Sequence, residues 1–437
     1  MKPSDPMAHP SDWRTVTVRE AIEIRRGVSW SKEQEHTSAR DGAIRVVGIS
    51  NVQKELDLTT VLYLSGVKPR IIDKKRVAFG WSLMVGSNGN RNRLGNAVIM
   101  RNDADFLFGS FLLAARPKPA FPITPEFFYR WLSSEPIQAH LSASSEGTTG
   151  LNNLSHSFFR NLKIAYPEPH EQEEIVKVLD VVDAALSAAR TARDRARDAK
   201  RALRQQLFAN GLRGDEPKKT SVGWIPAAWN VREVRSVVSE FQYGLSVSMQ
   251  TAGALPILRM GNIQDGDVLL KDLKYVTLPE RTTSPYMLSR GDVLFNRTNS
   301  QELVGKIGVY RSDKPAVFAS YLIRLKPDAS QVDGYFLGHL LDSHDVQCRI
   351  KRYATPGVQQ VNINATNLGK VLIAVPPGAD GLQEQKQVAA ILEQADTAIR
   401  AYGPKLRALG ELKRSLMHDL LTGHVRLNGR LTDVGAI

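Results

Sequence analysis

Apolar residues recur at alternating spacings of three and four along two long stretches of the chain, the pattern of an amphipathic helix with one apolar seam. We expect these helices over residues 171–209 and 383–421. Such a seam predicts packing against another helix. Its positions are Ile175, Leu179, Leu186, Leu203 and Leu207 in the first helix and Val388, Leu392, Ile399, Leu416 and Leu420 in the second.

The two predicted helices are copies of one another. Subtracting 175 from 388 gives an offset of 213 residues, and this offset carries Leu186 to Ile399. It also carries Lys200, which interrupts the first seam, to Lys413 in the second. Only the second helix contains Gly403–Pro404. Because proline removes a backbone donor and clashes with the preceding turn, we expect a kink there and not a continuous rod.

The segments before each helix repeat as well. Residues that match in the same order are Trp13 and Trp229, Asn51 and Asn262, Gly80 and Gly291, Asn88 and Asn299, and Pro167 and Pro376. Short apolar and β-branched runs predict strands at residues 44–49, 97–100, 162–166, 307–310, 321–325 and 371–375, with short helices near Phe127 and Phe336. The shared order and spacing indicate an internal duplication.

We therefore predict an α+β protein with two pseudo-repeated mixed domains, over residues 1–168 and 213–380. A long helix follows each domain, at residues 169–212 and 381–425, and residues 426–437 form a tail. Each domain is of a size that supports one hydrophobic core.

Charge suggests the class of partner. The chain has 437 residues, a formal net charge of +13 and a pI near 9.7, so it should attract polyanions such as nucleic acid. Cys348 is its only cysteine, which excludes an intramolecular disulfide framework and a cysteine-rich zinc module. No apolar signal region or membrane-length apolar run is present, so we expect a cytoplasmic protein without membrane association.

Catalytic motifs are not recognisable in the sequence. Neither G-x-x-x-x-G-K-[ST] nor G-x-G-x-x-G at a strand end occurs, and His170–Glu171 is not followed by the second histidine of an H-E-x-x-H zinc site. Val375–Pro376–Pro377 lacks the polar residue of the adenine-methylase tetrapeptide. An active site needs one precise arrangement of catalytic residues, whereas two divergent copies of a basic domain suit the recognition of two different DNA sequences. We expect no catalytic residues and no metal site.

Loops rich in Asn, Arg and Gly between predicted strands are the candidate DNA contacts, because guanidiniums pair with guanine or phosphate and carboxamides with adenine. The alternative is a set of solvated turns, since Asn and Gly favour turns. The candidates in the first half are Arg25, Arg26, Asn88, Asn90, Arg91, Arg93 and Thr149. Those in the second half are Gln242, Tyr243, Arg259, Asn296, Arg297, Asn299, Thr355 and Gln359.

With these features, the chain resembles the specificity subunit of type I restriction-modification enzymes. The resemblance covers nearly the whole chain. It rests on the GW-I-P-x-x-W segment at residues 223–229, the GDVLFNRTNS loop at residues 291–300, the proline and later Glu-Gln pair at the transition into each helix (Pro167 with residues 171–172, Pro376 with residues 384–385), and the order domain, helix, domain, helix. The first half departs most, with Trp81–Ser82 where the second has Asp292–Val293.

The resemblance implies that the two helices pair as an antiparallel coiled coil and hold apart two recognition domains, each reading one part of a split, asymmetric site in double-stranded DNA. It also implies two methyltransferase subunits that bind S-adenosylmethionine and, where restriction occurs, two restriction/translocase subunits that use ATP and Mg. This chain would bind none of these cofactors. A free-standing DNA-binding regulator, or an enzyme with strongly diverged motifs, are the alternatives.

Overall fold

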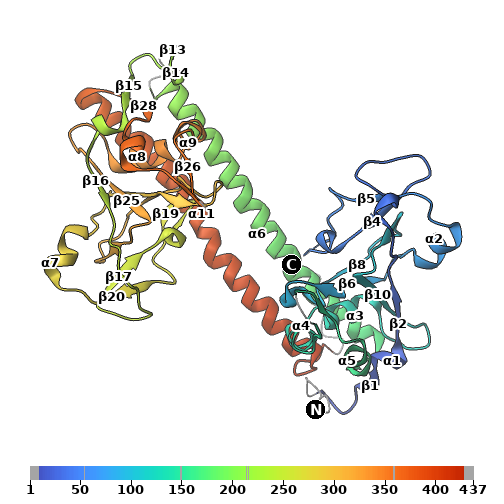
Figure 1. The fold of residues 1–437 in the computed structure, drawn as a ribbon. Coiled ribbons are helices and arrows are strands. Elements are labelled where there is room, and N and C mark those ends of the chain that lie inside the picture. Colours follow the sequence, from blue (N-terminus) through green and yellow to red (C-terminus); the bar gives the residue numbers. More distant parts are fainter. Residues whose placement is uncertain are drawn as a thin grey trace. The chain divides into compact units, whose positions relative to one another are not determined.

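The computed structural model describes residues 9–427 except 54, 148–149, 213, 215 and 358–359. The chain divides into two compact units, Met1–Arg190 with Pro404–Ile437, and Thr191–Gly403. Two long helices, α6 (Pro169–Asn210) and α11 (Gly378–Leu421), run through the boundary between the units. Each unit therefore contains one globular part, the beginning of one long helix and the end of the other (Figure 1).

The first unit combines short strands with short helices. Its strands are β1 (Arg14–Thr17), β2 (Ile22–Arg26), β3 (Glu35–His36), β4 (Ile44–Val47), β5 (Leu62–Leu64), β6 (Ser82–Val85), β7 (Ser87–Asn88), β8 (Ala97–Ile99), β9 (Phe106–Phe108), β10 (Leu112–Pro117), β11 (Asn152–Asn153) and β12 (Lys163–Tyr166). Its shorter helices are α1 (Val18–Ala21), α2 (Pro69–Lys75), α3 (Pro125–Leu132), α4 (Glu135–Ala143) and α5 (His156–Asn161), with 3-10 turns η1 (Lys32–Gln34), η2 (Ile49–Asn51) and η3 (Arg91–Arg93).

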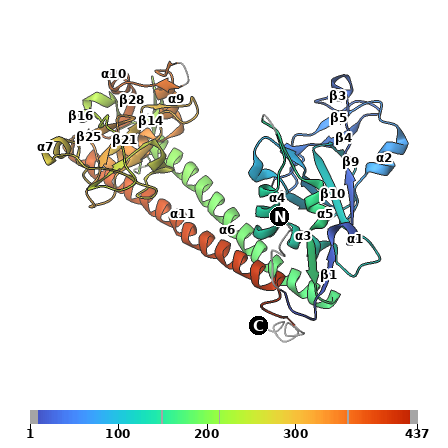
Figure 2. The same ribbon diagram turned by 60° about the horizontal axis from the view of Figure 1, so that its bottom comes forward.

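Two four-stranded sheets form the framework of the first unit. One has the order β2-β10-β6-β8 with antiparallel neighbours. The other has the order β3-β5-β4-β9, in which β4 and β9 are parallel. Short ladders join β1 to β12 and β7 to β11. Met84 and Leu113 of the first sheet share a core with Phe127 of α3, which Figure 2 shows beside β10.

The second unit has the same mixture of elements. Its strands are β13 (Pro217–Thr220), β14 (Gly223–Pro226), β15 (Asn230–Glu233), β16 (Val238–Tyr243), β17 (Leu255–Leu258), β18 (Ile263–Gln264), β19 (Gly266–Val268), β20 (Lys274–Val276), β21 (Val293–Asn296), β22 (Thr298–Asn299), β23 (Ile307–Val309), β24 (Val317–Phe318), β25 (Leu322–Pro327), β26 (Thr355–Pro356), β27 (Val361–Asn362) and β28 (Leu372–Val375). Its shorter helices are α7 (Glu280–Thr283), α8 (Gly334–Leu341), α9 (His344–Lys351) and α10 (Ala365–Gly369), with 3-10 turns η4 (Val234–Ser236), η5 (Met260–Asn262) and η6 (Ser284–Tyr286).

The topology of the second unit repeats that of the first. Its strands β16-β25-β21-β23 follow the order of β2-β10-β6-β8, and β19 and β18 extend that sheet. The parallel pair β17-β24 repeats β4-β9, while β15-β28 and β22-β27 repeat β1-β12 and β7-β11. The predicted α+β class and internal duplication are confirmed, because strands expected from apolar runs occupy equivalent places in both sheets.

Both long helices begin slightly earlier than the apolar seams predict. The helix α11 also continues through Gly403–Pro404, so the expectation that the second rod is not continuous there is wrong, while the kink itself stays a prediction. Proline removes one main-chain donor, which is a small part of a ladder of 44 residues whose packed seams stabilise it. The boundary between the compact units falls at this dipeptide. Among the described residues, no helix is long and apolar enough to cross a membrane.

The long helices pair in opposite directions. In the first unit, buried Ile175 and Leu179 near the start of α6 share a core with Leu420 near the end of α11. In the second unit, Leu207 near the end of α6 shares a core with Val388 and Leu392 near the start of α11. Of the other seam positions, Leu186 is buried, whereas Leu203, Ile399 and Leu416 are half-buried.

A fully buried glutamine near the start of each long helix fastens that helix to its globular part. Gln172 donates Nε2–H to the carbonyl oxygens of Pro122 (2.7 Å) and Pro167 (2.8 Å), and its Oε1 accepts the Thr124 N–H. The second unit repeats these bonds. Gln385 donates to the carbonyl oxygens of Gln331 and Pro376 and accepts the N–H of Asp333. The Glu-Gln pairs at residues 171–172 and 384–385 therefore belong to the joint between each domain and its helix.

A polar cluster of the second unit lies where α6, α11 and α8 meet. Lys200, which is 9% exposed, donates from Nζ to Asp396 Oδ1 at 2.6 Å. The buried His339 of α8 donates Nε2–H to Glu393 Oε1 at 2.8 Å, and Arg311 pairs with the same carboxylate. A lysine of one long helix and a histidine of the globular part thus share a pair of acidic residues on the other long helix.

The polar cluster of the first unit has the same construction. Lys413 of α11 donates to Asp183 of α6 at 2.6 Å. Arg130 of α3, which is 4% exposed, donates to Asp183 and to Asp180, and Arg101 lies 3.8 Å from Asp180. Burial raises the pKa of Asp183, but hydrogen bonds from Lys413 and Arg130 outweigh it and hold the pKa below its usual range.

The two polar clusters are reciprocal. The offset of 213 that carries Lys200 to Lys413 also carries Asp183 to Asp396, so each helix gives its lysine to the carboxylate of the other. The same helix-to-helix contact thus occurs once in each unit. Because a buried charge without a partner is strongly unfavourable, these pairs fix the register of the helices.

The first prediction concerns the unequal burial of the two lysines. Lys200→Met should lower the free energy of unfolding by about 3 kcal/mol, because the buried Asp396 loses the one cation that donates a hydrogen bond to it among the described residues. Lys413→Met should lower it by about 1 kcal/mol or less, since Asp183 keeps Arg130 and its lysine is more exposed. Urea unfolding followed by circular dichroism measures both. Equal losses would contradict this account, and the double variant Lys200→Met/Asp396→Leu should recover most of the loss.

The second prediction concerns acid. Burial lowers the pKa of His339 in the folded chain, and Lys200 acts in the same direction against the hydrogen bond to Glu393. The unfolded chain therefore takes up the proton first, so stability is complete above about pH 6.5 and falls as the pH drops below it. Unfolding midpoints at pH 7.5 and 5.5 should differ less for His339→Gln than for the wild type. A wild-type difference no larger than that of the variant would refute this.

Candidate nucleic-acid interface

An equivalent loop follows the third strand of the main sheet in each unit. In the first unit it passes through β7, which pairs with β11, and Ser87 Oγ donates to Asn153 Oδ1 at 2.6 Å. In the second unit it passes through β22, which pairs with β27, and Thr298 Oγ1 donates to Asn362 Oδ1 at 2.5 Å. The candidate residues Asn88 and Asn299 therefore occupy the same place in the two halves.

Polar side chains of the first loop largely hold its own conformation. Asn88 Oδ1 accepts the N–H of Asn90, and Asn90 Oδ1 accepts the N–H of Asn92 and caps η3. Arg93 donates to the carbonyl oxygens of Ile49 (3.2 Å) and Val52 (2.8 Å). Arg91 is exposed, and no hydrogen bond of its guanidinium occurs within the described part of the chain. Arg91 is thus the cation of this loop best placed to meet a ligand.

The second loop brings an arginine and a tyrosine together. The guanidinium of Arg297 lies 4.9 Å from the ring centre of Tyr243, at the end of β16. Tyr243 is 40% exposed, and its hydroxyl accepts the N–H of Ala365 at 2.9 Å. Asn296 is fully buried, whereas the half-buried Asn299 donates to the sulfur of Met260 at 3.5 Å. An aromatic ring stacked with a guanidinium is a surface that can contact bases or sugars.

The pair Arg25–Arg26 and its counterpart Gln242–Tyr243 end equivalent strands. Arg25 lies 4.3 Å from the ring centre of Trp81 and pairs with Glu23, so its charge is engaged within the unit. Gln242 donates to the carbonyl of Pro285 at 3.2 Å. Arg26 is exposed and lines a cavity. The second residue of each pair, and not the first, faces outward.

A glycine directly after each pair lets the chain pass close to a neighbouring turn. An added Cβ would lie 2.2 Å from the Gly109 carbonyl oxygen at Gly27, and 2.4 Å from the Ala319 carbonyl oxygen at Gly244. Both contacts are shorter than any real side chain tolerates. These glycines therefore fix where Arg26 and Tyr243 emerge.

The remaining candidates fall in different places. Arg259 donates to the carbonyl of Asp272 at 3.0 Å, next to Met260 and therefore close to Asn299. Thr355 is exposed on β26, which pairs with β27 in the same small sheet as β22. Thr149 and Gln359 lie outside the described residues. The second unit thus gathers Arg259, Asn299 and Thr355 around one sheet.

An exposed aromatic residue at a turn of each unit was missed by the sequence analysis. Phe111 and Tyr321 precede β10 and β25 and are 50% and 41% exposed. Both carbonyl oxygens accept bonds from the candidate loops, from the N–H of Ser87 at 3.1 Å and of Arg297 at 3.1 Å. The signal was present, because these residues match in the repeat, but Tyr321 was assigned to a predicted strand and Phe111 was given no role.

Among the residues that the structure describes, two groups of acidic and histidine side chains have ligand atoms close enough together for a metal ion. One, His339 with Glu393 and Asp396, already has Lys200 and Arg311 as its cations. The other, His418 with Asp419 and His424, has two exposed histidines. Neither group has a further feature that points to a metal, so neither is assigned as a metal site.

Comparison with known proteins gives the same duplicated organisation. The family model for the type I restriction modification DNA specificity domain matches residues 10–193 and again residues 242–405. The chain is 33% identical over 210 residues to the putative type I restriction enzyme MjaX specificity subunit of Methanocaldococcus jannaschii, a match that spans 47% of this chain and 48% of that relative.

Two relatives match over most of their length. The StySPI specificity subunit of Salmonella potsdam is 22% identical over 429 residues, which cover 96% of this chain and 91% of the relative. The EcoKI specificity subunit of Escherichia coli is 21% identical over 428 residues with the same coverage. The solved S subunit from M. genitalium has a TM-score of 0.53 at 15% identity, covering 96% of this chain and 98% of its own, and it supports the fold.

Proposed function

Because the chain belongs to the type I restriction-modification DNA specificity family, we propose that it is the DNA-recognition subunit of a type I complex and is not catalytic by itself. Its target would be bipartite and asymmetric, with one part read by each globular half. The observation that carries this proposal is the double match of the family model to two halves with equivalent loops. The loops carry different side chains, so the two half-sites should differ.

Catalysis would belong to partner subunits. Two methyltransferase subunits would bring S-adenosylmethionine, and in restriction two restriction/translocase subunits would use ATP and Mg. The helices of the first unit carry exposed apolar side chains suited to such docking. Val181 of α6 is 68% exposed and Leu412 of α11 is 47% exposed. Exposed apolar residues on a packed helix pair favour a partner surface.

The third prediction tests which half-site each loop reads. Arg297→Ala should weaken recognition of one half-site by about 1–3 kcal/mol, because it removes the guanidinium stacked on Tyr243. Arg91→Ala is the matched change in the other half and should affect the other half-site. The measurement is binding of the chain with its methyltransferase to duplexes randomised in one half-site. Equal losses at both half-sites for either variant would point to a general charge effect.

The fourth prediction tests the proposed role of the helix pair as a spacer. Inserting seven residues after Arg190 in α6 and after Gly403 in α11 keeps the heptad phase of both seams and adds about 10 Å of helix. The degenerate gap of the methylated sequence should then grow by about three base pairs. Sequencing of methylated positions in cells that carry the variant reads the gap. A folded, active variant with an unchanged gap would exclude the spacer role.

A further inference from the structure

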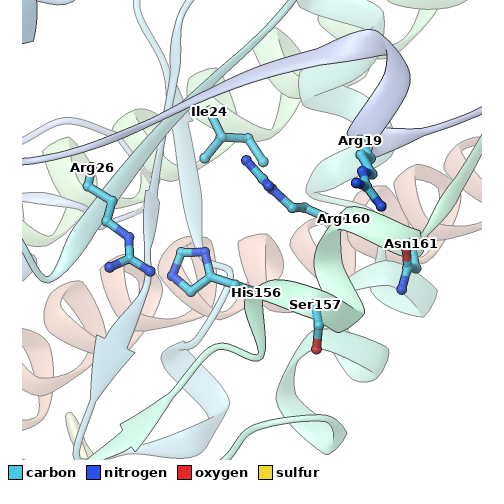
Figure 3. A pocket seen from close by; sticks show the side chains of 7 residues that line it. All are labelled: Arg19, Ile24, Arg26, His156, Ser157, Arg160 and Asn161. Carbon is cyan, nitrogen blue, oxygen red and sulfur yellow. The ribbon is translucent and has the colours of Figure 1, made fainter.

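A basic cavity of about 500 Å³ opens in the first unit (Figure 3). Of the candidate DNA-contacting residues described above, only Arg26 lines it. Its lining consists of Arg19, Ile24, Arg26, His156, Ser157, Arg160 and Asn161. Three of these seven side chains are guanidiniums and none is acidic. Figure 3 shows the guanidinium of Arg26 beside the imidazole of His156. The cavity is therefore built for a negatively charged group.

Three elements of the unit position the lining. Arg19 comes from α1, Arg26 from the end of β2, and Arg160 from α5, which also supplies His156. The Val18 N–H donates to the Leu162 carbonyl at 2.9 Å, which fastens α1 to the end of α5. The chain enters α5 directly from β11, the partner of β7. The cavity thus adjoins the loop that carries Asn88 and Arg91.

The charges of this cavity are not balanced within the unit. Nearby Glu23 pairs with Arg25 and Arg116, and Glu20 accepts bonds from Thr17. In the described part of the chain, no ion pair involves Arg19, Arg26 or Arg160. Like charges that converge without a counter-ion repel one another, so a bound anion would stabilise them.

His156 adds a neutral donor to this charged lining. Burial lowers the pKa of His156, and the charges of Arg26 and Arg160 lower it further. At neutral pH the imidazole is therefore uncharged and keeps one N–H. The guanidiniums can donate hydrogen bonds to a bound anion, and the His156 N–H and the Ser157 hydroxyl can donate further ones.

The second unit closes the equivalent position. The duplication places Tyr243 where the first unit has Arg26, and Ala365 and Gly369 where it has His156 and Arg160. The Tyr243 hydroxyl accepts the Ala365 N–H, and a Cβ added at Gly369 would lie 3.2 Å from the Cβ of Arg235 and 3.7 Å from the ring of Phe241. Two aromatic side chains and the stem of Arg235 thus lie at the position that forms a cationic cavity in the first unit.

We infer that this cavity binds one backbone phosphate of the DNA read by the first unit, an inference that rests on the proposed function. A guanidinium fork matches the oxygens of a phosphodiester. Ile24 is the only apolar side chain of the lining, and the lining contains no Phe, Tyr or Trp ring for a free base to stack on. The chemistry therefore fits a phosphate held by its own strand better than a separate nucleotide. The first half then contacts DNA at this position through guanidinium groups, and the second half through an aromatic surface.

The fifth prediction is a change in the salt dependence of DNA binding by the full chain with its methyltransferase. Arg26→Gln/Arg160→Gln should reduce the slope of log Kd against log salt by about 0.9, the value for one neutralised phosphate. Between 50 and 200 mM salt, the wild type should then lose about threefold more affinity than the variant. Arg70→Gln/Arg76→Gln, which removes two charges from α2 and its end, is the matched control.

Neutral methylphosphonate linkages, placed one at a time through the first half-site, locate the contact. One position should weaken binding of the wild type and leave Arg26→Gln/Arg160→Gln unaffected. An unchanged salt slope with no such position would overturn the inference, and so would binding of inorganic phosphate or AMP to the wild type alone with unchanged DNA binding. If the wild type selects no bipartite sequence, the proposed function fails. If it selects one and the variant behaves identically, only the cavity inference fails.

Discussion

The carboxylate that each long helix offers to a lysine of the other is the constraint on which the rest of the structure depends. Asp396 is buried, where an unpaired charge would be strongly unfavourable, and the half-buried Asp183 is paired with both Lys413 and Arg130. Apolar seams alone allow helices to slide by a heptad, because each layer resembles the next. A lysine that must find one carboxylate removes that freedom. Asp183 also pairs with Arg130 of the first globular part, and Glu393, near Asp396 on α11, pairs with His339 of the second. The acidic residues that fix the register of the helices therefore also fix the position of each globular part on its helices.

Duplication preserved this constraint while its chemistry diverged. The first unit uses a guanidinium, which is always charged, where the second uses an imidazole that burial keeps neutral. A similar divergence occurs in the main sheets. Trp81 lies beneath Arg25 and Arg116, whereas its counterpart Asp292 lies 3.6 Å from Arg324, and burial raises the pKa of that carboxyl. One backbone thus accommodates different interiors, provided that each buried polar group has a partner.

Most polar side chains of the first candidate loop are hydrogen-bonded within their own unit, so few of them can bind a ligand. The side-chain oxygens of Asn88 and Asn90 accept hydrogen bonds from N–H groups of their own loop, and Arg93 donates to a main-chain carbonyl oxygen nearby. These three side chains therefore stabilise the turn, as the alternative interpretation of the loop expects, whereas the exposed Arg91 can contact a ligand. A contact surface built in this way is rigid before DNA arrives, which reduces the entropy lost on binding.

The sequence by itself determined the two long helices, the duplication and the basic character, because periodicity, self-similarity and charge are read along the chain without knowledge of its path. It also marked Lys200 and Lys413 as breaks in the seams. Only the tertiary structure decided which acid each lysine meets, that Arg93 is engaged while Arg26 is free, and that Arg26, His156 and Arg160 line one cavity. The physical reason is that partners far apart in sequence are chosen by how sheets and helices close around them, and the energy of a polar side chain depends on its partner and burial more than on its own chemistry.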